Sequence, residues 1–399
     1  MTARRFAHRA KPPDLNPRDY VSGDVYRDDV VFRAELDQVL GKVWHFACHE
    51  SEISDAGDYR TFQHATQPLF VIRGDDGAVR CFFNVCSHRG ARLLGDASGT
   101  ASRLTCFYHL WSYDSCGRCV DIPREEGYAA TGIEKSALGL REVRAETKWG
   151  LVFVTLDDDA PPLSDFLGQS LEIFDEVFGD ETVEYEVFHF HRGTVNANWK
   201  AWQETIVDLY HEFMHVVLRT TQMTAAPMTE RDMRTYPGGH LAIGGLKADY
   251  HNYKAYGARE DSKAFPGLTV DDARFTPLFP DTTIITRGTV MRIDTVTPID
   301  AHHTIVESRG LGIKGESAAD RQMRIRHHND YWGPFGRNVP EDAFAAEACE
   351  KAFGPGAARY QIIARDEGGH GQDDLMLRAY YKAWSDMTGR PANNPTNEE

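Results

Sequence analysis

Four side chains in the first third of the chain constrain its fold more than any other feature. Cys86 and His88 form a Cys-x-His pair, seventeen residues follow, and Cys106 and His109 form a Cys-x-x-His pair. Two thiolates and two imidazoles can serve together as the ligands of one metal site. The sequence therefore predicts a metal centre that two separate turns bring together.

The distribution of these ligands indicates which metal centre is present. A Cys₂His₂ zinc site usually takes a Cys pair from one arm and a His pair from the other, whereas here each arm supplies one of each. That arrangement suits a Rieske [2Fe–2S] cluster, in which one iron keeps two Cys ligands and the other takes two His ligands. A structural zinc site and four unrelated residues are the alternatives. The nearby CxxC of Cys116 and Cys119 has no second pair close by in the sequence and is interpreted as two incidental thiols on a hairpin turn.

Length and charge exclude several classes of protein. The chain has 399 residues, which favours two domains, and a net charge of −16 from 60 acidic and 44 basic residues. This acidic balance, without a basic cluster, disfavours nucleic-acid binding. No apolar run is long enough to cross a membrane, and the N-terminal segment lacks the apolar core of a secretory signal, so a cytoplasmic protein is expected. The seven cysteines are odd in number, and a disulfide framework is not expected.

Patterning along the chain favours an α+β fold. Residues 43–156 are rich in short alternating strands, with Asp75-Asp76-Gly77 as a hairpin turn. An acidic, Pro-containing linker at 157–162 follows, and Ser164 is expected to cap a helix. The remainder mixes both element types, with strands expected at 183–195, 282–299 and 302–313 and helices at 198–222, 316–332, 340–353 and 373–387. Strands and helices segregated in this way do not form a βαβ repeat.

A second group of ionisable residues lies on the helix expected at 198–222. Glu204, Asp208, His211 and His215 are spaced i, i+4, i+7 and i+11, which places all four on one helical face. The rest of this helix is apolar, and a buried charge without a partner is very unfavourable. A metal cation is the partner that two histidines one turn apart favour, whereas histidines satisfied by ordinary hydrogen bonds are the alternative.

Both groups of residues, in this order, resemble the α subunits of Rieske ring-hydroxylating oxygenases. The likeness is carried by CSHRGARL, CFYHLWSYD, NWK and ETIVDLYH, covers most of the chain, and is nearest in layout to terephthalate dioxygenase-like subunits. It implies an α+β fold with an antiparallel β Rieske [2Fe–2S] domain at 43–156. Residues 1–42 and 157–399 would then form a helix-grip (Bet v1-like or START-like) catalytic domain with a long iron-binding helix.

The resemblance also implies the ligands of a mononuclear Fe(II). His211 and His215 match the two histidine ligands, although three residues separate them where the family often has four. The carboxylate ligand comes from a late helix, where Asp342 is favoured and Asp374 is the alternative. Two histidines and one carboxylate form a facial triad that leaves positions open for O₂.

Further roles follow from the same resemblance. Asp208 matches a carboxylate that bridges a cluster histidine of one subunit, matching His109, to an iron-ligand histidine of the next, matching His211. This implies a homotrimer, α₃, or an α₃β₃ assembly with a small β subunit. Glu204 is expected to accept a hydrogen bond behind the iron ligands. NAD(P)H would be oxidised by a separate reductase, with or without a ferredoxin, because the GxGxxG at 310–315 lacks a βαβ context and is interpreted as a strand-to-helix turn.

The implied function is that of a terminal oxygenase α subunit that hydroxylates or cis-dihydroxylates an aromatic substrate, carboxylated aromatics included. One alternative is a Rieske monooxygenase for a small non-aromatic substrate, either an alkylsulfonate or an N-methyl or quaternary amine. Another is a non-catalytic Rieske electron carrier. The ionisable residues on the helix expected at 198–222 argue against this alternative. An arginine in the pocket would indicate an anionic substrate. Arg309 is one candidate for that role, and a surface position is its alternative.

Overall fold

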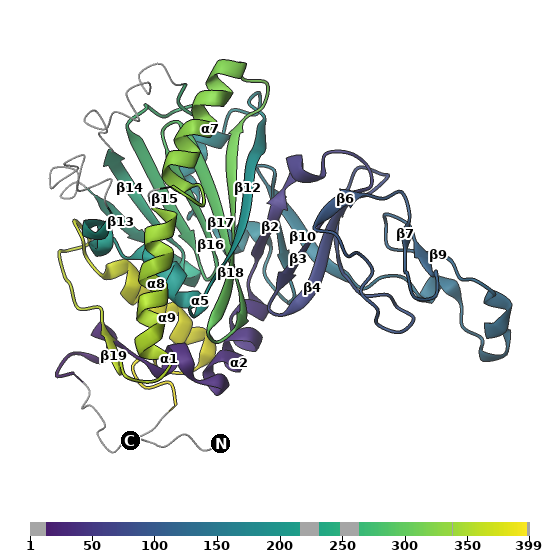
Figure 1. Ribbon diagram of the computed structural model, residues 1–399, viewed down its shortest axis with the longest axis horizontal. Coiled ribbons are helices and arrows are strands. Elements are labelled where there is room, and N and C mark those ends of the chain that lie inside the picture. The colour runs from purple at the N-terminus through teal and green to yellow at the C-terminus, as the bar shows by residue number, and fades with distance from the viewer. Residues whose placement is uncertain (1–12, 216–230, 248–262, 337, 397–399) are drawn as a thin grey trace.

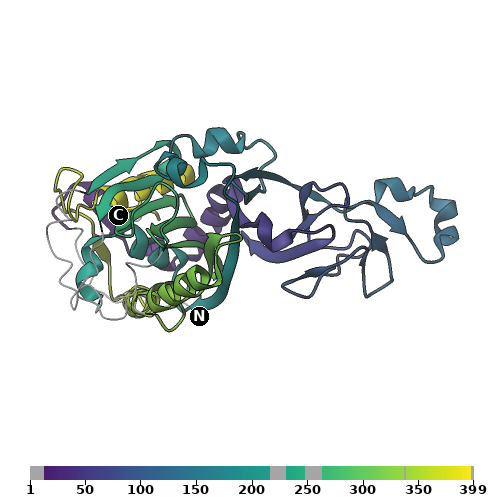
Figure 2. The same ribbon diagram turned by 90° about the horizontal axis from the view of Figure 1, so that it is seen from above.

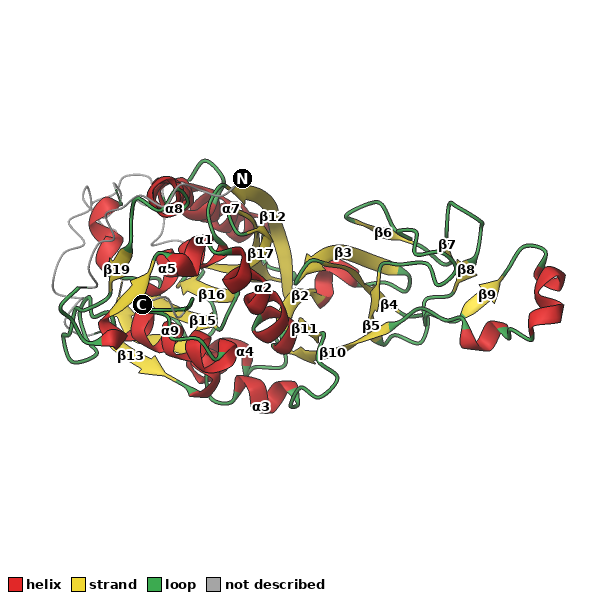
Figure 3. Ribbon diagram, turned by 90° about the horizontal axis from the view of Figure 1, so that it is seen from below, coloured by secondary structure: helices red, strands yellow, loops and turns green. Residues whose placement is uncertain are grey.

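The computed structural model describes residues 13–215, 231–247, 263–336 and 338–396. Two seven-stranded sheets lie one after the other along the long axis of an elongated molecule (Figures 1 and 2). The half that holds the first sheet consists mostly of strands, whereas most of the longer helices pack around the second sheet (Figure 3). Among the described residues, no helix has both the length and the apolar character needed to cross a bilayer.

The first sheet is antiparallel and has the strand order β2-β11-β10-β5-β4-β3-β6. A separate three-stranded sheet, β7-β8-β9, extends it towards the far end of the molecule (Figure 1). The hairpin turn expected at Asp75-Asp76-Gly77 is confirmed between β4 and β5, where Gly77 has a φ of 80°. The strands are β2 (His45–His49), β3 (Asp58–His64), β4 (Gln67–Arg73), β5 (Val79–Phe83), β6 (Ser98–Thr100), β7 (Leu104–Thr105), β8 (Ser112–Tyr113), β9 (Cys119–Asp121), β10 (Glu142–Lys148) and β11 (Leu151–Thr155).

The second sheet is antiparallel in the order β12-β18-β17-β16-β15-β14-β13, in which β13 to β18 form a meander and β12 pairs with β18 at one edge. The stretch expected as a strand at 282–299 is a hairpin that turns at Gly288, whose φ is 47°. A side chain there would meet the Thr269 carbonyl at 2.4 Å, so only glycine fits the turn. The strands are β12 (Tyr185–Val195), β13 (Asp232–Thr235), β14 (Leu241–Lys247), β15 (Asp272–Leu278), β16 (Thr282–Arg287), β17 (Val290–Asp300) and β18 (His303–Ile313).

The helices pack mainly around the second sheet. They are α1 (Asp24–Arg27), α2 (Asp29–Gln38), α3 (Leu163–Leu167), α4 (Asp175–Phe178), α5 (Trp199–Val207), α7 (Ala318–Trp332), α8 (Val339–Phe353) and α9 (Leu375–Thr388). The late helices agree with the sequence pattern. Ser164 does not cap a helix as predicted, because α3 already begins at Leu163 after Pro162. A two-stranded sheet of β1 (Tyr20–Ser22) and β19 (Tyr360–Ile362) joins the two ends of the chain.

The continuous helix predicted at 198–222 is interrupted within the described residues. Helix α5 ends at Val207, Asp208 has extended backbone angles (φ −89°, ψ 110°), and a 3₁₀ turn, η7 (Tyr210–Met214), follows. The Tyr210 N–H donates to the Asp208 carboxylate (2.7 Å), and the His211 ring hydrogen-bonds to the Asp208 carbonyl (2.5 Å). Such local side-chain and backbone bonds compete with a helix and explain the break. Residues 216–222 lie outside the described part of the chain.

The two faces of the second sheet bury different partners. One face packs against α5, α8 and α9 through side chains such as Trp202, Ile285 and Tyr380. The other shares a core with α3, α4 and the first sheet, in which Phe46 of β2 contacts the same cluster as Met291 of β17. This shared apolar core joins the two halves of the molecule.

Arg309 reinforces this joint and has no place in a pocket. It is almost fully buried and forms ion pairs with Glu52 (2.9 Å) and Glu307 (3.2 Å). Its guanidinium also donates to the Ala47 carbonyl at 3.1 Å. Neither role considered for Arg309, in a substrate pocket or on the surface, agrees with the structure.

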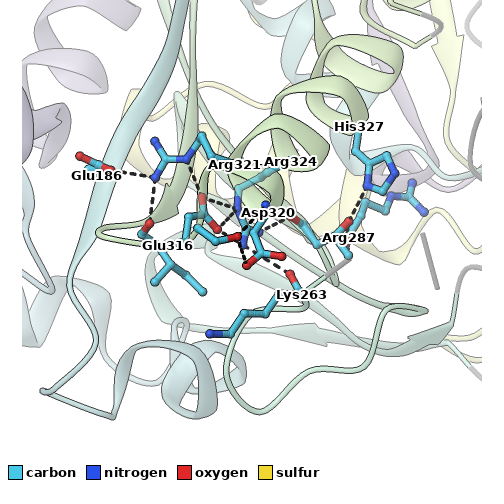
Figure 4. A network of polar contacts seen from close by, with 11 residues as sticks. Glu186, Lys263, Arg287, Glu316, Asp320, Arg321, Arg324 and His327 are labelled. Carbon is cyan, nitrogen blue, oxygen red and sulfur yellow. Dashed lines mark hydrogen bonds and ion pairs between the residues drawn. The ribbon is translucent and has the colours of Figure 1, made fainter. Parts of the chain in front are cut away.

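A polar network fastens α7 to the second sheet (Figure 4). Glu316 forms ion pairs with Arg324 (2.7 Å) and Arg321 (2.5 Å), and Arg321 also reaches Glu186 on β12 (2.7 Å). The glycines of the GxGxxG motif allow α7 to lie close to β18, since a side chain at Gly310 would stand 2.9 Å from the His328 ring. The first two glycines of this motif lie inside β18, so the predicted turn begins only beyond them.

Candidate functional site

The two arms of the first metal-binding motif adopt the same backbone loop. The Cys86 N–H donates to the carbonyl five residues later (2.8 Å), and the N–H four residues later donates back to the Cys86 carbonyl (3.0 Å). The loop at Cys106 repeats both bonds with the same lengths. The fourth residue after each cysteine, Gly90 or Leu110, has a positive φ of 71° or 60°. Two matching loops therefore present one thiol and one imidazole each to a common point.

Aromatic packing holds the imidazoles of this group in place. The His88 ring stacks on Trp111, with centroids 4.6 Å apart, and its centroid lies 4.5 Å from that of His109. The Tyr113 hydroxyl lies 3.2 Å from the Cys86 Sγ. The His88 Nδ1 is buried and has no hydrogen-bond partner among the described residues. An unpaired ring nitrogen beside two thiols and a second imidazole fits the ligand set of a Rieske [2Fe–2S] cluster.

Three side chains from η7 and α8 form the second candidate site. The Nε2 atoms of His211 and His215 are 3.2 Å apart, and each lies 3.4 Å from the Oδ1 atom of Asp342. Ligands bound at about 2.1 Å and at right angles would lie roughly 3 Å apart, close to this triangle. The Asp342 Oδ1 is buried and accepts no hydrogen bond from the described residues. The donor set therefore fits a facial triad of two histidines and one carboxylate.

Glu341 and the backbone of Asp208, whose carbonyl hydrogen-bonds to the His211 ring at 2.5 Å, orient these histidines. The Glu341 carboxylate lies 2.8 Å from the His215 Nδ1, and the Asp208 carboxylate lies 3.7 Å from the His211 Nδ1. Although burial opposes protonation, the carboxylates of Asp208 and Asp342 raise the pKa of His211 to about 10. A bound cation would displace this proton, because ligand histidines must be neutral. No sequence pattern marks Glu341 for this role, although it directly precedes the predicted ligand Asp342.

Two other acids considered from the sequence do not face the triad. Asp374 accepts the Arg365 N–H (2.9 Å) in the loop before α9, so it does not lie with the two histidines. Glu204 accepts the hydroxyl protons of Tyr26 and Tyr381 between α1, α5 and α9, and burial raises its pKa to about 7. The expectation that Glu204 supports the iron ligands is wrong, because the break after Val207 turns the triad away from the helical face that carries Glu204.

A cavity opens beside the triad, between the inner face of the second sheet and the helices. Its wall combines apolar and aromatic side chains with polar and charged ones, and two arginines project from neighbouring strands into it. The lining includes Ile206, Leu209, Phe275, Ile285, Trp332, Arg287 and Arg292 together with the three triad residues. Such a mixture suits an organic molecule that carries a charged substituent.

A second cluster of two histidines and an aspartate lies at the joint between the two halves. His45, His64 and Asp281 are all buried, and the His45 Nδ1 lies 2.8 Å from the Asp281 carboxylate. The His45 and His64 rings stack with centroids 4.3 Å apart, and burial lowers the pKa of His64 to about 3. We interpret this cluster as a polar contact between the two sheets.

Comparisons with known proteins agree with this architecture. The family model for the Rieske [2Fe-2S] domain matches residues 43–135. The chain is 43% identical over 392 residues to the 2-aminobenzenesulfonate 2,3-dioxygenase subunit alpha of Alcaligenes sp, covering 98% of this chain and 99% of that protein. It is 35% identical over 407 residues to the methanesulfonate monooxygenase hydroxylase subunit alpha of Methylosulfonomonas methylovora, covering 99% and 97%. The fold matches that of naphthalene 1,2-dioxygenase with indole bound, with a TM-score of 0.79, 21% identity, and coverage of 96% of this chain and 95% of that one.

The chain therefore belongs to the α subunits of the Rieske non-haem iron oxygenases. It is an O₂-dependent enzyme that carries a [2Fe–2S] cluster and a mononuclear iron. Like the rest of this family, it receives electrons from NAD(P)H through a reductase or ferredoxin and works as a multimer.

Proposed function

We propose that each metal centre is held by the residues that the sequence indicates. The [2Fe–2S] cluster is assigned to residues 43–156 and the iron to a catalytic domain of residues 1–42 and 157–399. When bound, the cluster stores and passes single electrons and the iron binds and activates O₂. The observation that carries the proposal is the close triangle of ligand atoms from His211, His215 and Asp342. The ligands of the cluster are Cys86, His88, Cys106 and His109.

Asp208 is the proposed link between the two centres of neighbouring subunits. Within one chain, the end of the molecule that carries β7 and β9 points away from α5 and α8 (Figure 1), which favours electron transfer between subunits. The Asp208 carboxylate is partly exposed beside His211 and has room to accept a second hydrogen bond. The proposed donor is His109 of the neighbouring subunit. This residue is partly exposed in the loop of residues 106–110, which we name the cluster tip. A cyclic homotrimer would supply this contact three times.

Exposed apolar side chains near both ends of this link support the same assembly. Such side chains are rarely clustered on a free surface without a partner. On the cluster tip they are Phe107, Tyr108 and Leu110, and on η7 they are Tyr210 and Phe213. If one contact between two subunits covered both groups of apolar side chains, the cluster tip of one subunit would lie against η7 of the next. A small β subunit, giving α₃β₃, is compatible with this contact.

The proposed substrate is an aromatic ring that carries a sulfonate group. The relative with 43% identity over almost the whole chain is named for 2-aminobenzenesulfonate, and the aromatic wall formed by Phe275 and Trp332 suits a ring. The alternative is a small alkylsulfonate, which the relative with 35% identity favours by its name. Oxygenation of the ring as a cis-dihydroxylation is the proposed outcome. A cytoplasmic location follows from the need for NAD(P)H.

Substrate screening and metal analysis test this proposal. We expect the purified trimer to contain about three irons per chain, two in the cluster and one in the triad. With a compatible reductase, NADH oxidation should be stimulated by 2-aminobenzenesulfonate and yield an oxygenated ring. Product from methanesulfonate but not from the aromatic sulfonate would favour the alternative, and two irons per chain without any product would contradict both.

Asp208→Asn tests the electron link separately. The amide keeps the size of the side chain but removes the charge that would accept two N–H bonds. The variant should keep the cluster absorption, three irons per chain and the trimeric mass, yet lose almost all product formation. Turnover equal to that of the wild type would refute the bridging role. Asp232→Asn, in an exposed pair with Arg234, is a matched control and should leave turnover unchanged.

A further inference from the structure

Arg287 is a buried cation inside the cavity at the triad. It is the last residue of β16, and its side chain projects to the same face as Ile285, two residues earlier. Only 8% of its surface is exposed, and it lines the same cavity as the triad residues. Arginine remains charged in proteins, so this position places a permanent positive charge beside the triad.

The described residues leave this charge without a counter-ion. The guanidinium lies over the rings of Phe275 (5.1 Å) and Tyr331 (5.7 Å), and no carboxylate among the described residues forms an ion pair with it. Its Nε is buried and has no hydrogen-bond partner in the described part of the chain. Ring faces offset only part of the desolvation of a guanidinium. An anion that entered the cavity would supply the missing partner.

Apart from Asp342, which is assigned to the iron, the other carboxylate and arginine side chains that line the cavity are paired within the protein. Arg292 forms an ion pair with Asp294 at 2.9 Å, and Glu212 forms one with Arg231 at 2.8 Å. The opposite charges of each pair cancel one another, so neither pair offsets the charge of Arg287. The excess positive charge of the cavity is therefore concentrated on one side chain.

The backbone at Arg287 is held firmly enough to fix the position of a ligand. The Thr289 N–H donates to the Arg287 carbonyl, and the Thr289 hydroxyl lies 3.2 Å from the His327 ring on α7. Gly288 between them permits this tight turn, since a Cβ at that position would clash with the Thr269 carbonyl. The hairpin and α7 thus fix the backbone of Arg287, and the rings of Phe275 and Tyr331 lie against its guanidinium.

We propose that Arg287 binds the anionic substituent of the substrate and so sets which ring atoms face the triad. The planar guanidinium can donate two parallel N–H bonds to two oxygens of one sulfonate, as it does to a carboxylate or phosphate. A ring bound in this way has its charged substituent on β16 and its remaining edge towards His211, His215 and Asp342. This inference rests on the proposed oxygenase function and adds the residue that selects the anionic substrate.

Binding without turnover provides the direct test. The oxidised holoenzyme, without reductase, would be titrated with 2-aminobenzenesulfonate by equilibrium dialysis. Arg287→Gln should weaken this binding roughly 100-fold, because one partner of a buried charged contact is lost. Arg287→Lys keeps the charge but not the two-point contact, and should fall between the wild type and Arg287→Gln. Benzoate tests the wider class of ring anions and should show the same order of variants if carboxylates also bind.

A matched control removes an arginine from the other face of the same sheet. Arg274 on β15 pairs with Glu176 outside the cavity, so Arg274→Gln should bind the sulfonate as the wild type does. Aniline, which lacks the anionic group, should be oxidised by Arg287→Gln at least as well as by the wild type. This reversal of preference would not follow from a purely structural role of Arg287.

The outcomes separate this inference from the proposed function. Binding of the sulfonate by Arg287→Gln and Arg287→Lys with the affinity of the wild type would overturn the role of Arg287, even if the wild type oxidises the sulfonate. Failure of the wild type to oxidise any ring, sulfonated or not, would instead overturn the proposed function. If Arg287→Gln lost its cluster absorption or iron, Arg287→Lys would decide, and unchanged affinity in that variant would overturn the inference.

Discussion

A buried ion pair positions the helix that leads to the triad, and its removal should destabilise the catalytic half strongly. Glu35 on α2 is fully buried and lies 2.6 Å from the Lys200 Nζ in the first turn of α5. The same carboxylate accepts the indole N–H groups of Trp199 (2.9 Å) and Trp384 (2.8 Å), so it joins α2, α5 and α9. Glu35→Gln keeps the shape but leaves the ammonium without its counter-charge.

Two estimates of the loss agree. Breaking one partner of a buried ion pair typically costs about 3–5 kcal/mol. Burial already lowers the pKa of Lys200, and in the variant the ammonium can lose its proton instead of remaining as an unpaired buried charge. Deprotonating a lysine of ordinary pKa at pH 7 costs about 4.6 kcal/mol, which sets an upper bound for this proton loss. At about 2–4 °C per kcal/mol, the unfolding midpoint should fall by roughly 6–20 °C.

Thermal unfolding followed by tryptophan fluorescence measures this fall, and the cluster absorption reports the other half of the molecule. Glu50→Gln is the control, because the pair of Glu50 with Arg73 is partly exposed and contributes about 1 kcal/mol or less. Adding Lys200→Met to Glu35→Gln should recover part of the loss, since the stranded charge is then absent. A midpoint shift for Glu35→Gln no larger than that of Glu50→Gln would refute the reasoning.

Two further predictions concern the triad and acid stability. Asp342→Ala should lose the mononuclear iron but keep the visible spectrum of the cluster, whereas Asp374→Ala should keep both; iron analysis showing the reverse would make Asp374 the ligand. His240 is fully buried, accepts the Phe279 N–H at Nδ1 (3.0 Å) and donates from Nε2 to the Phe166 carbonyl (2.8 Å), and burial lowers its pKa to about 4. Because the unfolded chain takes up a proton near pH 6.5 and the folded chain does not, the contribution of His240 is complete above pH 6.5. As the pH falls towards 4, the contribution of His240 to the free energy of unfolding decreases by about 1.4 kcal/mol per pH unit. His240→Asn should therefore show a shallower decline of the unfolding midpoint between pH 6.5 and 5, and equal slopes would contradict this.

The proposed ligands of both centres could mostly be selected from the sequence, because most of them depend on short spacings within local segments. The pairs Cys86/His88 and Cys106/His109 each lie within one loop, and His211 lies in η7 while His215 directly follows it. Their chemistry is fixed by residue type, and their proximity follows from a few bonds of backbone. Even the error about the helix at 198–222 left these two histidines together, since η7 also brings positions i and i+4 close.

The tertiary structure decided which distant residues join these local groups. The sequence left Asp342 as the favoured carboxylate and Asp374 as the alternative, and the packing of α8 brings Asp342 to the histidines. Likewise, Arg287 and Arg309 both lie on strands of the second sheet, and alternation of side chains sends one into the cavity and the other into the joint between the halves. The sequence determined the chemistry that the chain can perform, because ligand spacing is local. Only the closed fold brings Asp342 to the two histidines and sets the charge of the pocket, because these depend on contacts between residues far apart in the chain.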